Sequence, residues 1–103
     1  MAIGGSSGCP GNVIGGNLQV GNNSAATSLF NNTVAGDLTD QSNTAPTQVV
    51  GNSVSGNLTV QNNTASTQVS NNTVTKSLNC VSNVSISGGG NTANPKQGQC
   101  ASF

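Results

Sequence analysis

The 103-residue sequence contains no His, Trp or Tyr, only two Phe, and only 4% charged residues. An ordinary globular domain carries about 25% charged residues. So few large apolar side chains exclude a conventional hydrophobic core. The formal net charge of zero is equally untypical of disordered chains, which usually carry a high net charge. The chain therefore either folds as a regular repeat or does not fold.

The shortage of charge also excludes several kinds of partner. Two lysines without any arginine cannot displace the counterions of a nucleic acid, which requires clustered basic side chains. No apolar run approaches the length of a membrane-spanning helix. The sequence has no acidic cluster and no glycine–aspartate calcium repeat that could bind a metal. We therefore expect no nucleic-acid partner, no membrane insertion, no cofactor and no small-molecule substrate.

What the sequence has instead is a 20-residue repeat that starts at Gly11 and continues without a gap. Two columns of the repeat are Asn, at its second and thirteenth positions: Asn12, Asn32, Asn52, Asn72, and Asn23, Asn43, Asn63, Asn83. Three columns are aliphatic, at the fourth, eighth and nineteenth positions: Ile14, Val34, Val54, Val74; Leu18, Leu38, Leu58, Leu78; and Leu29, Val49, Val69. The row that follows places Thr92 in the first Asn column, and the last aliphatic column ends in Gly89.

The segments between the Asn and Gly positions predict β-strands. They alternate apolar and polar residues and are rich in β-branched side chains, so that Leu58 and Val60, for example, are expected to point inward. Gly, Asn, Ser and Thr are weak helix formers, and no window shows a helical period. The sequence thus predicts an all-β fold, a parallel β-helix (β-solenoid) of about five 20-residue coils, with a right-handed coil favoured.

We expect a single domain over residues 1–103, with an N-terminal half-coil at 1–10, four full coils at 11–90 and a terminal coil at 91–103. A weak half-repeat within each row indicates two similar sides. Asn tolerates the left-handed conformation that a tight corner needs, and stacked Asn side chains form hydrogen-bonded ladders. We therefore place both Asn columns at corners, as structural ladders rather than ligand-binding amides. The Gly column at the sixth position is predicted to be a further corner with positive φ.

The three cysteines indicate the compartment. Cys80 and Cys100 are one repeat apart, so they fall in one inward column on adjacent coils, within the Cα separation of a disulfide. Their disulfide would join the terminal coil to the rest, and the alternative is two buried thiols. A disulfide indicates secretion to the extracellular space or the cell surface, so we expect a mature secreted form with a new Met at its start. Cys9 falls in the column of Leu29, where it is either a buried thiol or pairs with another subunit.

Segments such as NTVAGDL, NSVSGNLTVQNNTAST and NNTVTKSLNC, followed by GGGNTANPKQGQC, resemble small secreted repeat proteins of actinobacteria. Those proteins carry tandem Asn-Thr-Val-x-Gly-Asn-Leu units and end in Lys-x-Gly-Gln-Cys. The resemblance covers the chain from about Asn12 onward, and its most specific part is Cys80 with residues 96–100. It implies a right-handed β-helix and export, and no particular function. The chain departs from the pattern at residues 92–95, where another Val-x-Gly-Asn would be expected.

The sequence lacks the residues of an active site. Its only acidic pair is Asp37 and Asp40, and strand alternation turns Asp37 outward and Asp40 inward, so they cannot flank a substrate as a catalytic pair does. We therefore expect no enzymatic activity. Our first hypothesis is a non-enzymatic extracellular structural protein, whose open strand edges pair end to end with other copies into a filament.

Two alternative functions remain open. Flat, neutral, Thr-rich β-solenoids are an ice-binding architecture, and the Asn-x-Val-x-Gly units resemble those of ice-binding proteins of grasses. However, the outward seventh and ninth columns do not form a regular Thr array, and the regular column of Thr27, Thr47 and Thr67 is expected to point inward. The other alternative is a cell-surface polysaccharide-binding module, against which the shortage of aromatic residues counts.

Overall fold

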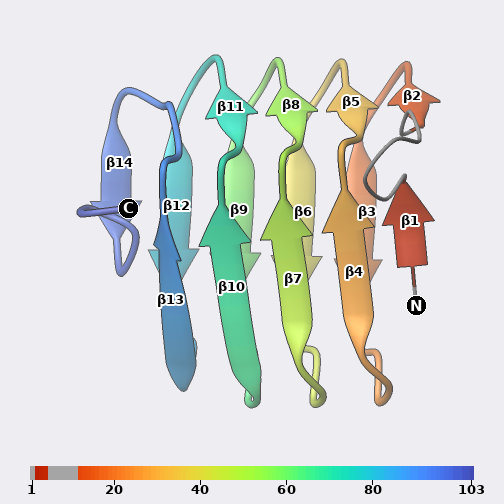
Figure 1. Cartoon of the computed structure of the whole chain (residues 1–103), viewed down its shortest axis with the longest axis vertical. Helices are drawn as coiled ribbons and strands as arrows, with labels where there is room; N and C mark the ends of the chain where they lie inside the picture. The colour runs from red at the N-terminus through yellow and green to blue at the C-terminus, as the bar shows by residue number, and fades with distance from the viewer. Residues whose placement is uncertain (1, 5–11) are drawn as a thin grey trace.

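The computed structural model describes residues 2–4 and 12–103, and this part of the chain forms an all-β parallel solenoid of about four turns without a helix (Figure 1). Each turn passes through three sheets, so the cross-section has three sides. Two of these sides, with strands of four or five residues in the middle turns, are the two similar sides expected, and the third side was not expected. One of the three sides consists of strands of only two residues, which are too short to give a recognisable alternation in the sequence.

Each sheet collects one strand from every turn, paired in parallel. Sheet A faces the viewer in Figure 1 and contains β1 (Ala2–Gly4), β4 (Thr27–Phe30), β7 (Thr47–Val50), β10 (Ser66–Ser70) and β13 (Ser85–Gly89). Sheet B, at the top, contains β2 (Val13–Ile14), β5 (Thr33–Val34), β8 (Ser53–Val54) and β11 (Thr73–Val74). Sheet C, at the rear, contains β3 (Leu18–Gly21), β6 (Leu38–Gln41), β9 (Leu58–Gln61), β12 (Leu78–Val81) and β14 (Lys96–Gly98).

The path of the chain is visible in Figure 1. The front strands of sheet A run upward, the chain crosses sheet B at the top, and the rear strands of sheet C run downward. Each turn lies to the left of the one before it, so the chain winds in the right-handed sense. Strand register keeps the 20-residue repeat in the middle turns, as between Leu38 and Leu58 on sheet C.

The prediction of about five coils is slightly too high, because the two ends leave the 20-residue register. Ile3 on β1 lies opposite Leu29, in the position where the repeat had placed Cys9. Cys9 and most of the predicted half-coil lie outside the described residues. After Gly90 the chain adds one bridge, between Thr73 and Thr92, and the three-residue strand β14. Residues 91–103 therefore do not build a regular coil.

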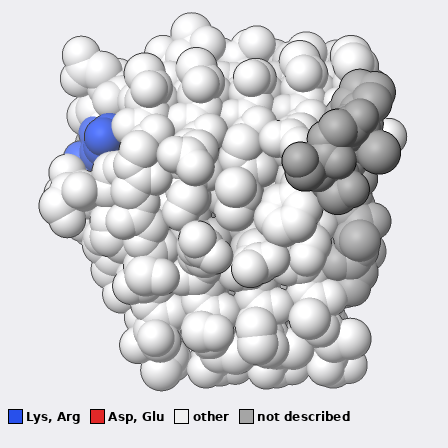
Figure 2. All heavy atoms as spheres, in the orientation of Figure 1, with Lys and Arg blue, Asp and Glu red and all other residues white. Residues whose placement is uncertain are grey.

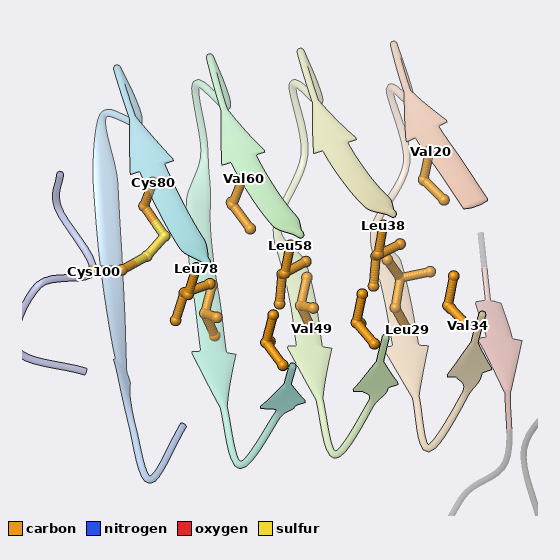
Figure 3. Close-up of a cluster of buried hydrophobic side chains, with 13 residues drawn as sticks. Val20, Leu29, Val34, Leu38, Val49, Leu58, Val60, Leu78, Cys80 and Cys100 are labelled. Atoms are coloured by element: carbon orange, nitrogen blue, oxygen red, sulfur yellow. A yellow bond between two sulfur atoms is a disulfide. The ribbon is translucent and has the colours of Figure 1, made fainter. Parts of the chain in front are cut away.

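The predicted aliphatic columns form the core, which lies between the three sheets (Figure 3). The Leu column illustrates the packing: Leu38, Leu58 and Leu78 have no exposed surface, whereas Leu18 in the first turn is only partly buried. The remaining buried members of the predicted columns are Leu29, Val34, Val49, Val54, Val69 and Val74, and Ile14 of the first turn packs against them. The column of Thr27, Thr47 and Thr67 is also buried, as predicted.

Candidate functional site

Buried Asn ladders occupy two of the three corners. At the corner between sheets A and B, the backbone N–H of Asn32 donates to Oδ1 of Asn52 at 2.9 Å, and the Nδ2 of Asn32 donates to the same oxygen at 3.0 Å. Asn52 makes the same pair of bonds to Asn72, at 2.9 and 3.0 Å. The corner between sheets C and A repeats the pattern from Asn43 to Asn63. The predicted ladders are therefore present.

The buried amides of Asn52 and Asn72 each make a second bond, to the backbone. The Nδ2 of Asn52 donates to the carbonyl of Leu29 at 2.8 Å, and that of Asn72 donates to the carbonyl of Val49 at 2.8 Å. Asn52 and Asn72 have no exposed surface. Because a buried polar group needs a partner for each donor and acceptor, these amides hold the coils together and are not available to a ligand.

The tight bend at these corners lies one residue before the ladder. The ladder residues themselves do not have positive φ, contrary to expectation; the residues that precede them do, namely Asn22, Asn31, Ser42, Asn62, Asn71 and Ser82, together with Gly51 and Gly90. Gly and Asn alternate in one of these positions for a steric reason. A Cβ on Gly51 would overlap Oδ1 of Asn31 from the turn before it.

Both ladders end in residues that the 20-residue period missed. Oδ1 of Asn91, 19 residues after Asn72, accepts from the N–H and Nδ2 of Asn72 at 2.9 Å each. The 20-residue period places Thr92 in this column, but the residue that completes the ladder is one position earlier. Oε1 of Gln99 accepts from the N–H and Nδ2 of Asn83 at 2.9 and 3.0 Å, so that a longer amide side chain replaces Asn at the end of the second ladder.

The third corner, between sheets B and C, carries a more exposed ladder. Here the side chain of one turn accepts from the backbone N–H of the next: Oδ1 of Asn17 from Asp37 at 2.8 Å, and Oδ1 of Asp37 from Asn57 at 2.7 Å. A Cβ on Gly36 would overlap Oδ1 of Asn17. The Gly column therefore leaves room for this ladder, and its members do not have the positive φ expected for them.

Asp40 is the one buried carboxyl group among the described residues. It points inward from β6, in register with Val20 and Val60, and has no exposed surface. The Nδ2 atoms of Asn43 and Asn63 donate to its two oxygens at 2.6 and 3.3 Å. Burial raises the pKa of Asp40 to about 6, although the two amide bonds act in the opposite direction. Asp37 is not fully buried and lies at a different corner, so the two carboxyl groups do not form a catalytic pair.

Cys80 and Cys100 form the predicted disulfide, with their Cα atoms 5.3 Å apart. The register is not the predicted one, because the strand partner of Cys80 is Gly98. Cys100 lies in the turn that follows β14, and both cysteines are fully buried (Figure 3). Cys9, predicted to be either a buried thiol or an intermolecular one, lies outside the described residues.

The C-terminal end of the solenoid is closed by its own chain. The carbonyl of Phe103 accepts from the N–H of Asn91 at 3.1 Å, and Phe103 packs against the core. Cys100, three residues before Phe103, is fully buried. The lysine surface seen in Figure 2, coloured blue, also lies toward this end, on the left. Lys96 is on β14, the outermost strand of sheet C.

Two core residues of the first turn are less buried than their equivalents in the later turns. Ile14 and Leu18, the first members of two core columns, are only partly buried. Val13 is 83% exposed and lies on the outer face of sheet B, in register with Thr33. β1, β2 and β3 are the outermost strands of sheets A, B and C at the N-terminal end. An outermost strand presents backbone groups that can pair with another chain.

The outer face of sheet B carries a row of small hydroxyl side chains. Thr33, Ser53, Thr73 and Thr92 lie opposite one another on successive turns and are all exposed. Neighbouring positions in this row are about 4.8 Å apart, the spacing of paired strands. This row is not predicted from the sequence, because strands of two residues show no alternation that would identify which residues point outward.

A groove of about 420 Å³ crosses the outer side of sheet A. It is lined by small side chains, such as those of Ser28 and Pro46, and by Gln48 and Gln68. The Nε2 of Gln48 donates to Oε1 of Gln68 at 3.5 Å. No aromatic side chain lines the groove, and neither does a charged one. The hydrogen bonds that it could make to a ligand are thus limited to amide and hydroxyl groups and the backbone.

Residues 2–4 and 12–103 contain no group of three or more His, Cys, Asp or Glu side chains that could hold a metal ion. They also contain no helix that is long and apolar enough to cross a membrane. No family model, curated protein or solved structure matches the chain. The resemblance to secreted actinobacterial repeat proteins therefore stays a prediction, and the function has to be argued from the solenoid itself.

Proposed function

We propose that the protein is a non-enzymatic structural β-solenoid that works outside the cell and associates end to end with other copies of itself. The observation that carries this proposal is the N-terminal end, where the core residues Ile14 and Leu18 are less buried than their equivalents in later turns. Apolar surface and strand edges at one end of a stack of coils favour contact with another stack. If both ends take part, the product is a filament.

The rest of the molecule supports a structural role. Most of the buried side chains pack the core or form the ladders. The face of the solenoid shown in Figure 2 is nearly free of charged side chains. The Cys80–Cys100 disulfide supports an extracellular location, because disulfides persist in oxidising compartments.

Light scattering after size-exclusion chromatography tests the association directly. We expect the average mass to exceed the 10.1 kDa of the monomer and to rise with protein concentration, with assemblies visible by negative-stain electron microscopy. A mass that stays at the monomer value at every concentration would contradict the proposal.

Ice binding is a second candidate, which the hydroxyl row on sheet B favours. The row is regular, exposed and uncharged, with Thr33, Ser53, Thr73 and Thr92 on successive turns. We expect thermal hysteresis and inhibition of ice recrystallisation, both abolished by Ser53→Lys in the middle of the row. Gln68→Lys on sheet A is the matched control and should leave both activities unchanged. A wild-type protein without either activity would exclude this candidate.

Polysaccharide binding has weaker support. The groove on sheet A is lined by amide and hydroxyl side chains such as Gln48 and Gln68. It offers no aromatic ring on which a sugar could stack, so a sugar would be held there by hydrogen bonds alone.

A further inference from the structure

We propose that residues 91–103 form a cap, latched over the last coil by the Cys80–Cys100 disulfide, which keeps the C-terminal end from pairing with another copy of the chain. This inference rests on the proposed end-to-end association and adds its regulation. While the disulfide is intact, the cap limits how far end-to-end association can proceed. When the disulfide is reduced, the cap opens and the C-terminal end takes part.

The cap occupies the place of a further coil in both buried ladders. In each ladder, a turn donates its N–H and Nδ2 to a side-chain oxygen of the turn that follows. For Asn72 this oxygen belongs to Asn91 of the cap, at 2.9 Å from both donors. For Asn83 it belongs to Gln99, at 2.9 and 3.0 Å. The side-chain amides of these two cap residues donate back to backbone carbonyls at 2.8 Å, so neither ladder continues beyond the cap.

The cap also covers the apolar end of the core. Leu78, the last member of its column, is fully buried, and Ala93 and Phe103 of the cap pack against the core. The ring of Phe103 lies against Gly88 of β13, where a Cβ would meet both the ring and the backbone of the neighbouring strand. Opening of the cap would therefore expose apolar surface as well as the ladder donors.

The disulfide is the strongest attachment of the cap. The strand β14 has three residues and pairs with β12 alone, and Thr92 makes a single bridge to Thr73. The disulfide joins residues 20 positions apart (Figure 3), and such a link stabilises the closed form by restricting the open one. Reduction by a dithiol transfers two electrons and two protons, so that both cysteines become thiols and the dithiol becomes a disulfide. Only noncovalent contacts then hold the cap.

A second copy of this chain is the partner that fits the opened end. Opening frees the N–H and Nδ2 groups of Asn72 and Asn83, which are placed to donate to the Asn oxygens of another coil. It also frees the edge of β12, which can then pair with another strand. Coils with Asn at both buried corners are what this chain consists of, so another copy matches the opened end in spacing and in chemistry.

A double variant removes the latch from the full chain. Cys80→Val combined with Cys100→Ala keeps an aliphatic side chain in the column, because the register neighbour of Cys80 is Val60. Val60→Ala is the matched control, since it weakens the same column and leaves the disulfide in place. Circular dichroism shows whether each variant keeps its strands. The wild-type chain with and without dithiothreitol provides the same comparison without any substitution.

Amide hydrogen exchange measures the opening of the cap. The N–H groups of Leu78, Thr92 and Gln99 donate across the boundary between the cap and the last coil, at 2.7 to 3.0 Å. Loss of the disulfide is expected to speed their exchange at least about tenfold. The N–H of Leu58, which donates to the next coil at 3.0 Å, should exchange as before. Unchanged exchange at all four positions would show that the disulfide is not the latch.

Light scattering at matched concentrations decides the inference. We expect the reduced chain and the double variant to have a higher average mass than the disulfide-bonded chain, with Val60→Ala unchanged. Equal masses with and without the disulfide would overturn this inference and leave end-to-end association standing. Association of the reduced chain alone would support the cap and contradict association of the disulfide-bonded protein. A monomer in every form would overturn both.

Discussion

Two corners of the solenoid bury their ladder and the third exposes it, and the side chains differ accordingly. At the buried corner between sheets A and B, Asn52 accepts two hydrogen bonds on Oδ1 and donates both to the next turn and to a backbone carbonyl. At the other buried corner, Asn43 and Asn63 donate to the next turn and to the carboxyl group of Asp40. At the exposed corner a side-chain oxygen accepts one bond from the backbone N–H of the next turn. Asn17, Asp37 and Asn57 can all provide this oxygen. The number of hydrogen bonds that a buried position must satisfy therefore decides which residues it accepts.

The largest effect that we expect comes from Asn52→Ala at a buried corner. The substitution leaves the N–H of Asn32 and the carbonyl of Leu29 without their partners inside the protein. Each buried unsatisfied group costs about 1–3 kcal/mol, so we expect a loss of about 4 kcal/mol in the free energy of unfolding. Guanidinium denaturation measures it. A loss below about 1 kcal/mol would show that the buried ladder is not what holds the coils together.

The next effect concerns Asp40, which places a carboxyl group beside a buried corner. Its folded pKa of about 6 lies above the value of 3.8 expected for the unfolded chain. Asp40 therefore contributes stability that is fully present below pH 3.8 and is lost as the pH rises through about 6. From pH 7 to pH 4 we expect the free energy of unfolding to increase by about 2 kcal/mol, measured by denaturation across this range.

Two variants separate the buried carboxyl from the exposed one. Asp40→Val matches its register neighbours Val20 and Val60 and frees the amides of Asn43 and Asn63 for backbone carbonyls. We expect it to abolish the pH dependence and to stabilise the protein at pH 7 by about 2 kcal/mol. Asp37→Asn at the exposed corner is the matched control, since it removes the other carboxyl group and keeps an acceptor for the N–H of Asn57. An unchanged profile in Asp40→Val would show that another group titrates.

The smallest effect is expected at the exposed corner. Asn57→Ala removes the acceptor for the N–H and the hydroxyl of Ser77, at 3.1 and 2.8 Å. Because water can replace these partners at a half-exposed position, we expect a loss of about 1 kcal/mol, near the net value of one hydrogen bond. Thermal denaturation beside Asn52→Ala measures the contrast. Equal losses in the two variants would remove the distinction between buried and exposed corners.

The sequence predicted the core and the buried ladders well for a particular reason. Leu38, Leu58 and Leu78 occupy the same position in successive repeats, and all three are fully buried. An inward position is therefore recognisable because the same residue type occurs there in every coil. The signal failed where the environment is not repeated. Gln99 ends a ladder at an offset of 16 residues, and Cys100 reaches Cys80 from a turn after β14. Neither position has an equivalent in the earlier coils.

The candidate sites were likewise predictable only where a repeated or alternating pattern marks them. The inward Asp40 followed from strand alternation, but the Asn amides that hold it could not be identified from spacing, because one is three residues away and the other 23. The hydroxyl row from Thr33 to Thr92 was missed, since a strand of two residues shows no alternation. The closure of the C-terminal end depends on where Phe103 folds back, which the sequence does not indicate.

The sequence by itself determined that this chain stacks similar coils, because a 20-residue period with inward Leu, Val and Asn can satisfy its apolar and amide groups only by repetition. It also determined that the long solenoid faces are neutral, and it indicated that Cys80 and Cys100 pair. The tertiary structure alone decided that the coil has three sides and about four turns. It alone decided how the C-terminal end is closed, because the chain leaves its 20-residue period at β13 and long-range contacts then place the last segment.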